Sequence, residues 1–307
     1  MAALAFSGAA AAQETAAHDA ATDIALSPPL TAVSPPPAQP AAPPPKDFRL
    51  IFTLPLLGTN NAAGAISERA GASGSPDIHV NPDLMLRWMH QYDSVRLSAS
   101  ADIAFDRYAT NTDQSSDTVT GVLKAALTNG RSDLFVPYVS YTGIADYEPG
   151  FSIRDDALHS FALGFSSGIG ISAAGAVIPF RDSSGVGDWS FAADLSFGRR
   201  LAAPRDFDST FATFVTDVVY NLRSDVHLGL LSKVRYRDYD SYFGQSRRDT
   251  FVAFQARVEL TPEWLTRALP GAELDLAVEF QQNMSTLETA RYTRWETGPA
   301  LILTRRF

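Results

Sequence analysis

The amino-acid sequence predicts an all-β fold: a closed antiparallel transmembrane β-barrel of about 12 strands that follows a disordered N-terminal segment. Three observations lead to this prediction. From Phe48 onward, apolar and polar residues alternate with a period of two, which is the period of a strand with two different faces. No run of about 18 apolar residues occurs, so a helical membrane span is excluded. The chain ends in a strand whose last residue is the aromatic Phe307.

The composition narrows the range of partners and chemistry. The chain has 307 residues and a formal net charge of −9, and no block rich in Lys or Arg occurs. Since nucleic acids bind basic surfaces, no nucleic-acid partner is predicted. The chain has no cysteine, which excludes disulfides and thiolate metal sites. No metal-ligand cluster or phosphate-binding loop has a recognisable spacing, so the sequence predicts no metal and no cofactor.

Residues 1–12 resemble the back end of a secretory signal peptide. A short apolar region is followed by Ala10 and Ala12, which form the small-x-small pattern that precedes a cleavage site. Cleavage is expected before Gln13, although the usual basic leader is missing. The alternative is a flexible Ala-rich terminus. We interpret residues 1–12 as a signal peptide remnant that directs export.

Residues 13–46 are rich in Ala and Pro and poor in aromatic residues. Proline fixes φ and removes the backbone N–H donor, which favours an extended, polyproline-like path over a packed core. We predict a disordered periplasmic linker that leads into a barrel at 47–307. Two roles stay open for this linker: a plain spacer, or a tether that binds the cell wall or a periplasmic partner.

The alternation is clearest over 95–108. Apolar residues from Val95 to Phe105 occupy one face, whereas Arg96 and Asp102 lie among small and polar residues on the other. In a transmembrane barrel the apolar face contacts lipid and the polar face lines the lumen. The predicted strands are 48–57, 78–91, 95–108, 118–128, 134–145, 157–168, 189–200, 210–222, 226–237, 252–260, 273–281 and a last strand that ends at Phe307.

The predicted connections alternate between short and long. Short turns such as 129–131 and 221–225 suit the periplasmic side of a barrel, and longer polar connections suit the other side. Residues 169–186 break this rule, and three alternatives stay open for them: a turn, a plug in the lumen, or missed strands. Residues 261–271 predict a short helix that Thr261 caps. The longer polar connections are expected at 59–77, 109–117, 146–156, 201–209, 239–247 and 283–294.

Aromatic residues on the apolar face lie near the predicted strand ends. Amphipathic rings favour the boundary between lipid and water, so these residues predict girdles at the two interfaces. The alternative is a soluble fold whose core the rings fill. The residues of the predicted girdles are Phe105, Tyr141, Trp189, Phe197, Tyr236 and Phe307.

The polar faces carry charges that form the best candidate site. One strand has a basic stripe, and the next strand but one has an acidic stripe. Arg96, Asp102, Lys124 and Asp194 are expected across the lumen, so that positive and negative walls oppose each other. Opposed charges in a confined, poorly screened space tune ion selectivity. The alternative is a ladder of salt bridges that fills and stiffens a closed lumen. The predicted lumen or constriction charges are Arg96, Asp102, Lys124, Asp194, Lys233, Arg235, Arg237, Arg257, Glu259, Glu273, Asp275 and Glu279.

The last strand resembles the assembly signal of bacterial outer-membrane β-barrels. Leu301, Leu303 and Phe307 share one face, and the pattern departs from the family at Arg305. The resemblance is at class level and is closest to porin-like barrels of Gram-negative bacteria. It implies an outer-membrane location, a periplasmic N-terminal segment, contact with outer-membrane lipid, and recognition by the barrel assembly machinery through the last strand. It also implies a passive channel for small polar or charged solutes.

Two other functions were compared with the channel. The first is a closed structural barrel that anchors a periplasmic tether or partner, and its motivation is the segment 13–46. The second is a lipid-modifying enzyme, because outer-membrane phospholipase A is also a barrel of this size and uses a His and a Ser two residues apart. No His of this chain is followed two residues later by Ser, and His159 and Ser160 are adjacent, so they point to opposite faces. No catalytic residue is predicted, and the chain is not expected to be an enzyme.

Overall fold

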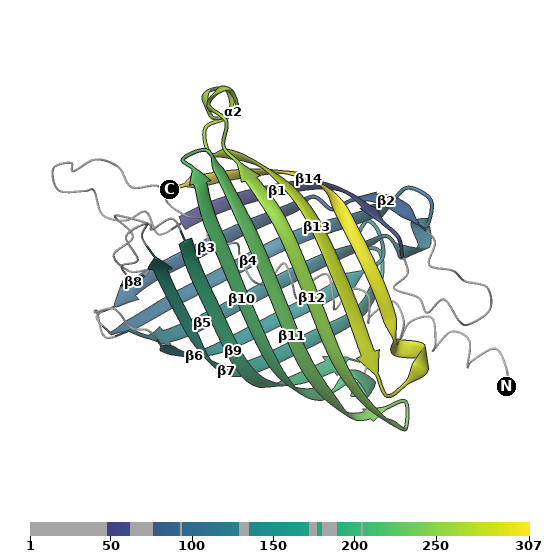
Figure 1. Ribbon diagram of the computed structural model, residues 1–307. Coiled ribbons are helices and arrows are strands. Elements are labelled where there is room, and N and C mark those ends of the chain that lie inside the picture. Colours follow the sequence, from purple (N-terminus) through teal and green to yellow (C-terminus); the bar gives the residue numbers. More distant parts are fainter. Residues whose placement is uncertain are drawn as a thin grey trace.

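The computed structural model describes residues 48–61, 76–92, 94–128, 135–171, 177–179, 189–203 and 205–307. The predicted signal peptide remnant and the linker at 13–46 lie outside the described residues. The described part is built almost entirely of antiparallel strands (Figure 1). Among its residues, no helix is both long enough and apolar enough to cross a membrane.

The strands follow one another around a single sheet, which closes where the last strand pairs with the first. Closure leaves no free edge, which satisfies the backbone hydrogen bonds inside a bilayer. The strands are β1 (Phe48–Thr59), β2 (Asp77–Val80), β3 (Asp83–Tyr92), β4 (Val95–Tyr108), β5 (Ser116–Leu127), β6 (Val136–Tyr147), β7 (Arg154–Ile171), β8 (Val177–Pro179), β9 (Trp189–Ala203), β10 (Ser209–Arg223), β11 (Val226–Tyr242), β12 (Gln245–Leu260), β13 (Ala272–Ser285) and β14 (Tyr292–Arg306). The helical segments are η1 (Thr112–Gln114), η3 (Arg205–Phe207), α2 (Glu263–Ala268) and η4 (Glu288–Ala290).

The described residues form a closed barrel of 12 strand positions plus one extra strand, which confirms the predicted fold class. Strands β2 and β3 share one position, because both pair with β1 on one side and with β4 on the other. The break between them falls at Asn81 and Pro82, and proline has no N–H to continue the ladder.

The extra strand bears on the uncertain segment 169–186. Strand β7 continues to Ile171, and β8 pairs with its last residues from Ile169 onward. A missed strand is therefore part of this connection, while residues 172–176 and 180–188 lie outside the described residues.

The barrel has the reverse polarity of a soluble protein. Large apolar side chains point outward and are exposed, as Leu163 (66%) and Leu230 (50%) illustrate. Charged side chains point inward and are buried, as Lys233 (4%) and Arg247 (1%) illustrate. A soluble sheet would bury the apolar face, so this distribution is that of a barrel embedded in lipid. The soluble alternative is wrong.

The six predicted girdle aromatics all lie on the outward face. Trp189 begins β9, and Phe307 directly follows β14, so both mark the end of the barrel where the chain terminates. Phe197 and Tyr236 are exposed but lie further inside their strands than expected, because β9 and β11 continue beyond the predicted ends. Phe105 packs edge-on against Phe151, and Tyr141 packs against Phe161 with ring centroids 5.9 and 5.0 Å apart respectively.

Two predicted long connections are wrong. The segment 239–247 is strand up to Tyr242 and again from Gln245, with a tight turn at Phe243 and Gly244 whose φ angles are 48° and 78°. The segment 283–294 likewise contributes to β13 and β14 on either side of η4. Around 238–248 polar residues occupy both faces of the strands, so the period of two is weak there although the backbone pairing continues.

The short helix predicted at 261–271 is present as α2. Its cap position is occupied by Pro262 without a side-chain hydrogen bond, so the predicted cap at Thr261 is wrong. Arg267 donates to Glu263 at 2.5 Å across one helical turn. Figure 1 places α2 at the same end of the barrel as the C-terminus.

The seam between β1 and β14 runs from Arg49 opposite Arg306 to Thr59 opposite Glu296. The N–H of Phe307 donates to the carbonyl oxygen of Phe48 at 2.9 Å beyond the end of the ladder. We call this end of the barrel, where β1 begins and β14 ends, the terminal end. The opposite end, which carries η1, η3 and η4, is the loop end.

Candidate functional site

The candidate site is the lumen, the space that the inner faces of the strands enclose. Residues that are directly opposite in paired strands lie on the same face of the sheet, and successive residues of one strand alternate between faces. A buried residue therefore shows which residues of its strand point inward. By this criterion all the predicted lumen charges lie on inner faces.

The basic stripe lies on β11. Lys233, Arg235 and Arg237 are all buried at successive inward positions. The Arg235 guanidinium lies 5.1 Å from the centroid of the Phe251 ring, and Nη1 of Arg237 donates to the hydroxyl of Tyr239 at 3.1 Å. The stripe therefore joins cations to aromatic rings on neighbouring strands.

Arg257 of β12 is the centre of a buried ion-pair cluster. Its Nη1 and Nη2 atoms donate to the two carboxylate oxygens of Asp217 on β10, both at 3.0 Å. Its Nε donates to Glu259 at 2.5 Å. All three residues are less than 9% exposed. The fork-to-fork geometry with Asp217 is the strong, bidentate form of this interaction.

The acidic stripe lies on β13. Glu279 accepts hydrogen bonds from the side chains of Gln255, at 3.2 Å, and Gln281. Glu273 and Asp275 lie nearer the terminal end and are in hydrogen-bond contact with each other. Strands β11 and β13 are separated only by β12, so the basic and acidic stripes lie side by side and do not oppose each other across the lumen.

The strand that lies halfway round the barrel from β11 is β4, six positions away through β12, β13, β14, β1 and the shared position of β2 and β3. Its inner face carries Asp102 and Asp106, together with Arg96 towards the terminal end. Asp102 interacts electrostatically with Asp83 of β3. The acidic groups that face the basic stripe are therefore on β4.

The remaining predicted lumen charges, Lys124 and Asp194, lie close together although two strands separate them in the sheet. Nζ of Lys124 on β5 lies 3.5 Å from the carboxylate of Asp194 on β9, with β6 and β7 between them in the sheet. The ammonium lies 3.4 Å from the centroid of the Tyr138 ring, and the Tyr138 hydroxyl donates to Asp194 at 2.5 Å. This cluster brings together two charges that the sequence had placed only on the same side of the lumen.

The sequence did not predict a second buried network, which lies around His79. The two ring nitrogens of His79 contact Asp106 at 2.6 Å and Glu296 at 2.9 Å. Arg294 binds Glu296 and donates to the hydroxyl of Tyr108 at 2.9 Å. The alternation of charged residues at 294 and 296 was the available signal, but it lay partly in a predicted loop.

A further cluster that the sequence did not predict surrounds Arg247 near the loop end. Its guanidinium lies 4.5 Å from the ring centroid of Tyr239 and 4.3 Å from that of Tyr242, and it donates to Asp249 from Nε at 3.0 Å. Phe207 of η3 packs on Tyr242. These residues fall in segments that were predicted as loops, which explains why they were not recognised.

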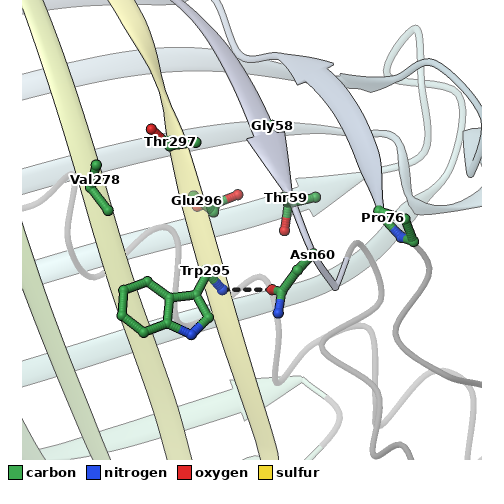
Figure 2. Close-up of a pocket in the computed structure, with 8 residues that line it drawn as sticks. All are labelled: Gly58, Thr59, Asn60, Pro76, Val278, Trp295, Glu296 and Thr297. Atoms are coloured by element: carbon green, nitrogen blue, oxygen red, sulfur yellow. Dashed lines mark hydrogen bonds between the residues drawn. The ribbon is translucent and has the colours of Figure 1, made fainter.

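A groove of about 400 Å³ lies at the seam near the loop end. Figure 2 shows its residues at the seam between β1 and β14, where the backbone N–H of Trp295 donates to Oδ1 of Asn60 at 2.7 Å. The lining residues are Gly58, Thr59, Asn60, Pro76, Val278, Trp295, Glu296 and Thr297. Most of these residues point outward, whereas Thr59 and Glu296 are buried and belong to the inner face.

Among the described residues, no three His, Asp or Glu side chains are grouped so that they could hold a metal ion. His159 is exposed on the outer wall and hydrogen-bonds the Tyr141 hydroxyl at 2.7 Å through Nδ1. Charged groups on an inner wall can exert an electrostatic field on ions in the space that the wall encloses.

Comparison with known proteins supports the fold. No family model matches the sequence, and no curated protein matches it. An outer-membrane channel from Pseudomonas putida F1 aligns with a TM-score of 0.51 at 10% identity, over 88% of this chain and 100% of that chain. The translocator domain of the autotransporter NalP from Neisseria meningitidis aligns at 0.41 and 8% identity, over 85% of this chain and 88% of that one. The KdgM porin, in complex with disordered oligogalacturonate, aligns at 0.40 and 11% identity, over 81% and 97%. The similarity to the first structure confirms the resemblance to outer-membrane β-barrels.

Proposed function

We propose that the chain is a passive outer-membrane channel for small polar or charged solutes. This proposal rests mainly on the charged inner wall. Its basic stripe, at Lys233, Arg235 and Arg237, lies halfway round the barrel from the acidic residues of β4. Separated charges of opposite sign create a transverse field, and such a field acts strongly on solutes in a confined, poorly screened space.

We further propose that the terminal end faces the periplasm. The turn between β10 and β11 at this end is short, whereas the loop end carries η1, η3 and η4. The segment 13–46 would then lie in the periplasm. Leu301, Leu303 and Phe307 lie on the outward face near the terminal end, where a barrel assembly machinery would read them in the membrane. We assign no catalytic role to the chain.

Neutralising the basic stripe tests the channel. The full chain is refolded into a planar bilayer, and currents are recorded in a KCl gradient for the parent and for Lys233→Gln/Arg235→Gln/Arg237→Gln. The parent is expected to conduct in discrete steps. The reversal potential of the variant is expected to shift toward cation preference, because three positive charges leave the path of the ions.

The matched control is Arg199→Gln/Arg205→Gln/Arg248→Gln, which removes the same charge from exposed positions outside the lumen. Its reversal potential is expected to stay near that of the parent. Equal reversal potentials for the parent and the lumen variant would remove the basic stripe from the permeation path. A folded parent that carries no current would overturn the channel itself.

A second candidate function is favoured by one observation. The lumen charges are largely buried, and many are bonded to one another, as in the cluster of Arg257, Asp217 and Glu259. Such bonds can stiffen a closed barrel whose role is to anchor the segment 13–46 to the cell wall or to a periplasmic partner.

Deleting residues 13–45 separates the two functions. The anchor predicts a weaker envelope, seen as increased sensitivity to detergent, with unchanged solute permeability, because the barrel remains but holds nothing. Insertion of an unrelated linker of the same length is the control for spacing. Normal detergent resistance in the deletion strain would argue against the anchor.

A further inference from the structure

Two carboxylates are neighbours on the inner wall, where β3 pairs with β4. Asp83 of β3 is directly opposite Ala104 of β4, and Asp102 is the next inward residue of β4. Diagonal neighbours of this kind are about 7–8 Å apart, and their Cβ atoms are somewhat closer. The two carboxylates interact electrostatically, and because their charges have the same sign they repel each other.

No cation that the structure describes is bonded to either carboxylate. Asp83 and Asp102 form no ion pair with a described residue, and Oδ1 of Asp83 is buried without a hydrogen-bond partner. The inward cation of β3, Arg87, lies four residues from Asp83, which is about 13 Å along the strand. Asp106, further along the same face of β4, differs because it contacts His79 at 2.6 Å.

A buried hydroxyl group is a second, independent feature of the same place. Thr120 of β5 is directly opposite Asp102 and is 1% exposed, yet its Oγ1 has no hydrogen-bond partner in the described part of the chain. The neighbouring inward hydroxyl, that of Thr118, donates to Asp146 at 2.8 Å. Buried polar atoms normally have a partner, and an exception points to a bound water or ion. Directly opposite Cβ atoms are about 4.5–5.5 Å apart, so an ion held by Asp102 is within reach of the Thr120 hydroxyl.

The unpartnered atoms at this place are all oxygens. A further one, Oδ1 of Asn81, belongs to the residue two positions before Asp83, and it is also buried without a hydrogen-bond partner. Carboxylate, amide and hydroxyl oxygens are ligands of hard cations such as Ca²⁺ and Mg²⁺. No third acidic or His side chain is grouped with the two carboxylates, so neutral oxygens and water would complete the coordination.

We propose that Asp83, Asp102 and Thr120 form a cation-binding site on the inner wall, which takes a divalent cation of the Ca²⁺ type. A cation between the carboxylates replaces their mutual repulsion by attraction to a shared charge. It also gives the Thr120 hydroxyl oxygen the partner that the protein itself does not supply. The site does not depend on the proposed channel.

Titration with CaCl₂ tests the site without any current. The full chain is placed in nanodiscs of zwitterionic lipid at low salt, and the heat of binding is measured by calorimetry. The parent is expected to bind Ca²⁺, and Asp83→Asn/Asp102→Asn is expected to weaken binding by about tenfold or more, because both charged ligands are lost. The control Asp238→Asn/Asp240→Asn, which removes the same charge from exposed positions outside the lumen, is expected to bind as the parent does.

Thermal unfolding is a second readout of the same site. In EGTA at low salt, the double variant Asp83→Asn/Asp102→Asn is expected to melt at a higher temperature than the parent, because the repulsion between the carboxylates is removed. CaCl₂ is expected to raise the melting temperature of the parent but not that of the variant. Absence of Ca²⁺ binding by the parent, or equal binding by the parent and the double variant, overturns the site.

Thr120→Val tests the hydroxyl with every charge left in place. The variant is expected to fold at least as stably as the parent, since a buried hydroxyl without a partner costs free energy. Its affinity for Ca²⁺ is expected to fall by about threefold or more, because one oxygen ligand is lost. Equal Ca²⁺ affinity for Thr120→Val and the parent would overturn the assignment of Thr120 to the site.

Two further measurements separate this site from simple screening and from the channel. KCl at the same ionic strength is expected to give no heat of binding, and equal heats for KCl and CaCl₂ would overturn a site for divalent cations. A protein that binds Ca²⁺ but carries no current retains the site and refutes the channel. A protein that conducts but does not bind Ca²⁺ does the reverse.

Discussion

Replacing Arg257 by methionine is expected to lower the free energy of unfolding by about 3–5 kcal/mol, because removing one partner of a buried ion pair leaves the other charge uncompensated. Two carboxylates are left in this case, those of Asp217 and Glu259, and both are buried. Methionine retains much of the volume, so the loss reports the charge rather than a cavity. The measurement is urea unfolding of the barrel in lipid vesicles, followed by tryptophan fluorescence.

Arg248→Met is the matched control. Arg248 lies on the outward face of the same strand and pairs with Asp238 at 3.4 Å, but both side chains are exposed. An exposed ion pair contributes about 0–1 kcal/mol, so the free energy of unfolding of this variant is expected to stay near that of the parent. If Asp217→Asn restores stability to Arg257→Met, the unpaired carboxylate is the cause. Equal losses for Arg257→Met and Arg248→Met would contradict the assigned role of the buried cluster.

Replacing Gly298 by alanine is expected to destabilise the barrel by about 3 kcal/mol, since overpacking costs of this kind reach that size when backbone must move. A Cβ at this position would lie 1.9 Å from the carbonyl oxygen of Leu56 and 3.1 Å from the Cα of Leu57. Both atoms belong to the backbone of β1, so no side-chain rotation relieves the clash. The strain falls on the seam that closes the barrel.

Gly121→Ala is the control, because a Cβ there meets nothing within 4 Å. It is expected to change the free energy of unfolding by about 0.5 kcal/mol or less, because the added methyl group meets no neighbouring atom. Folded barrel is quantified by its mobility in unheated gel samples, and stability by urea unfolding. If Gly298→Ala gives the same folded yield and the same urea midpoint as Gly121→Ala, the seam tolerates a wider separation of β1 and β14.

The local pattern was sufficient to predict the strands and their faces. Over 95–108 the sequence places Ile103 on the lipid side and Asp106 on the lumen side, and the structure exposes the first at 39% and buries the second at 9%. These assignments depend only on the period of two within one strand, which a single sequence contains. The strand ends around 238–248 were predicted less well, because polar residues occupy both faces there.

The partners of the lumen charges could not be predicted in the same way. His79 contacts Glu296 across 217 residues of sequence, and Arg257 contacts Asp217 across 40. Such contacts follow from the register of each strand pair and from barrel closure, and neither is encoded in the pattern of one strand.

The sequence by itself therefore determined the class of the fold, the number of strand positions and which side chains face lipid, because alternation is a local property of the backbone. The tertiary structure alone decided which charges are bonded to one another, as in the cluster of Arg257, Asp217 and Glu259. It placed the basic stripe of β11 beside the acidic stripe of β13 and halfway round the barrel from β4. Position around a closed sheet depends on strand order and register, so it exists only once the first and last strands have paired.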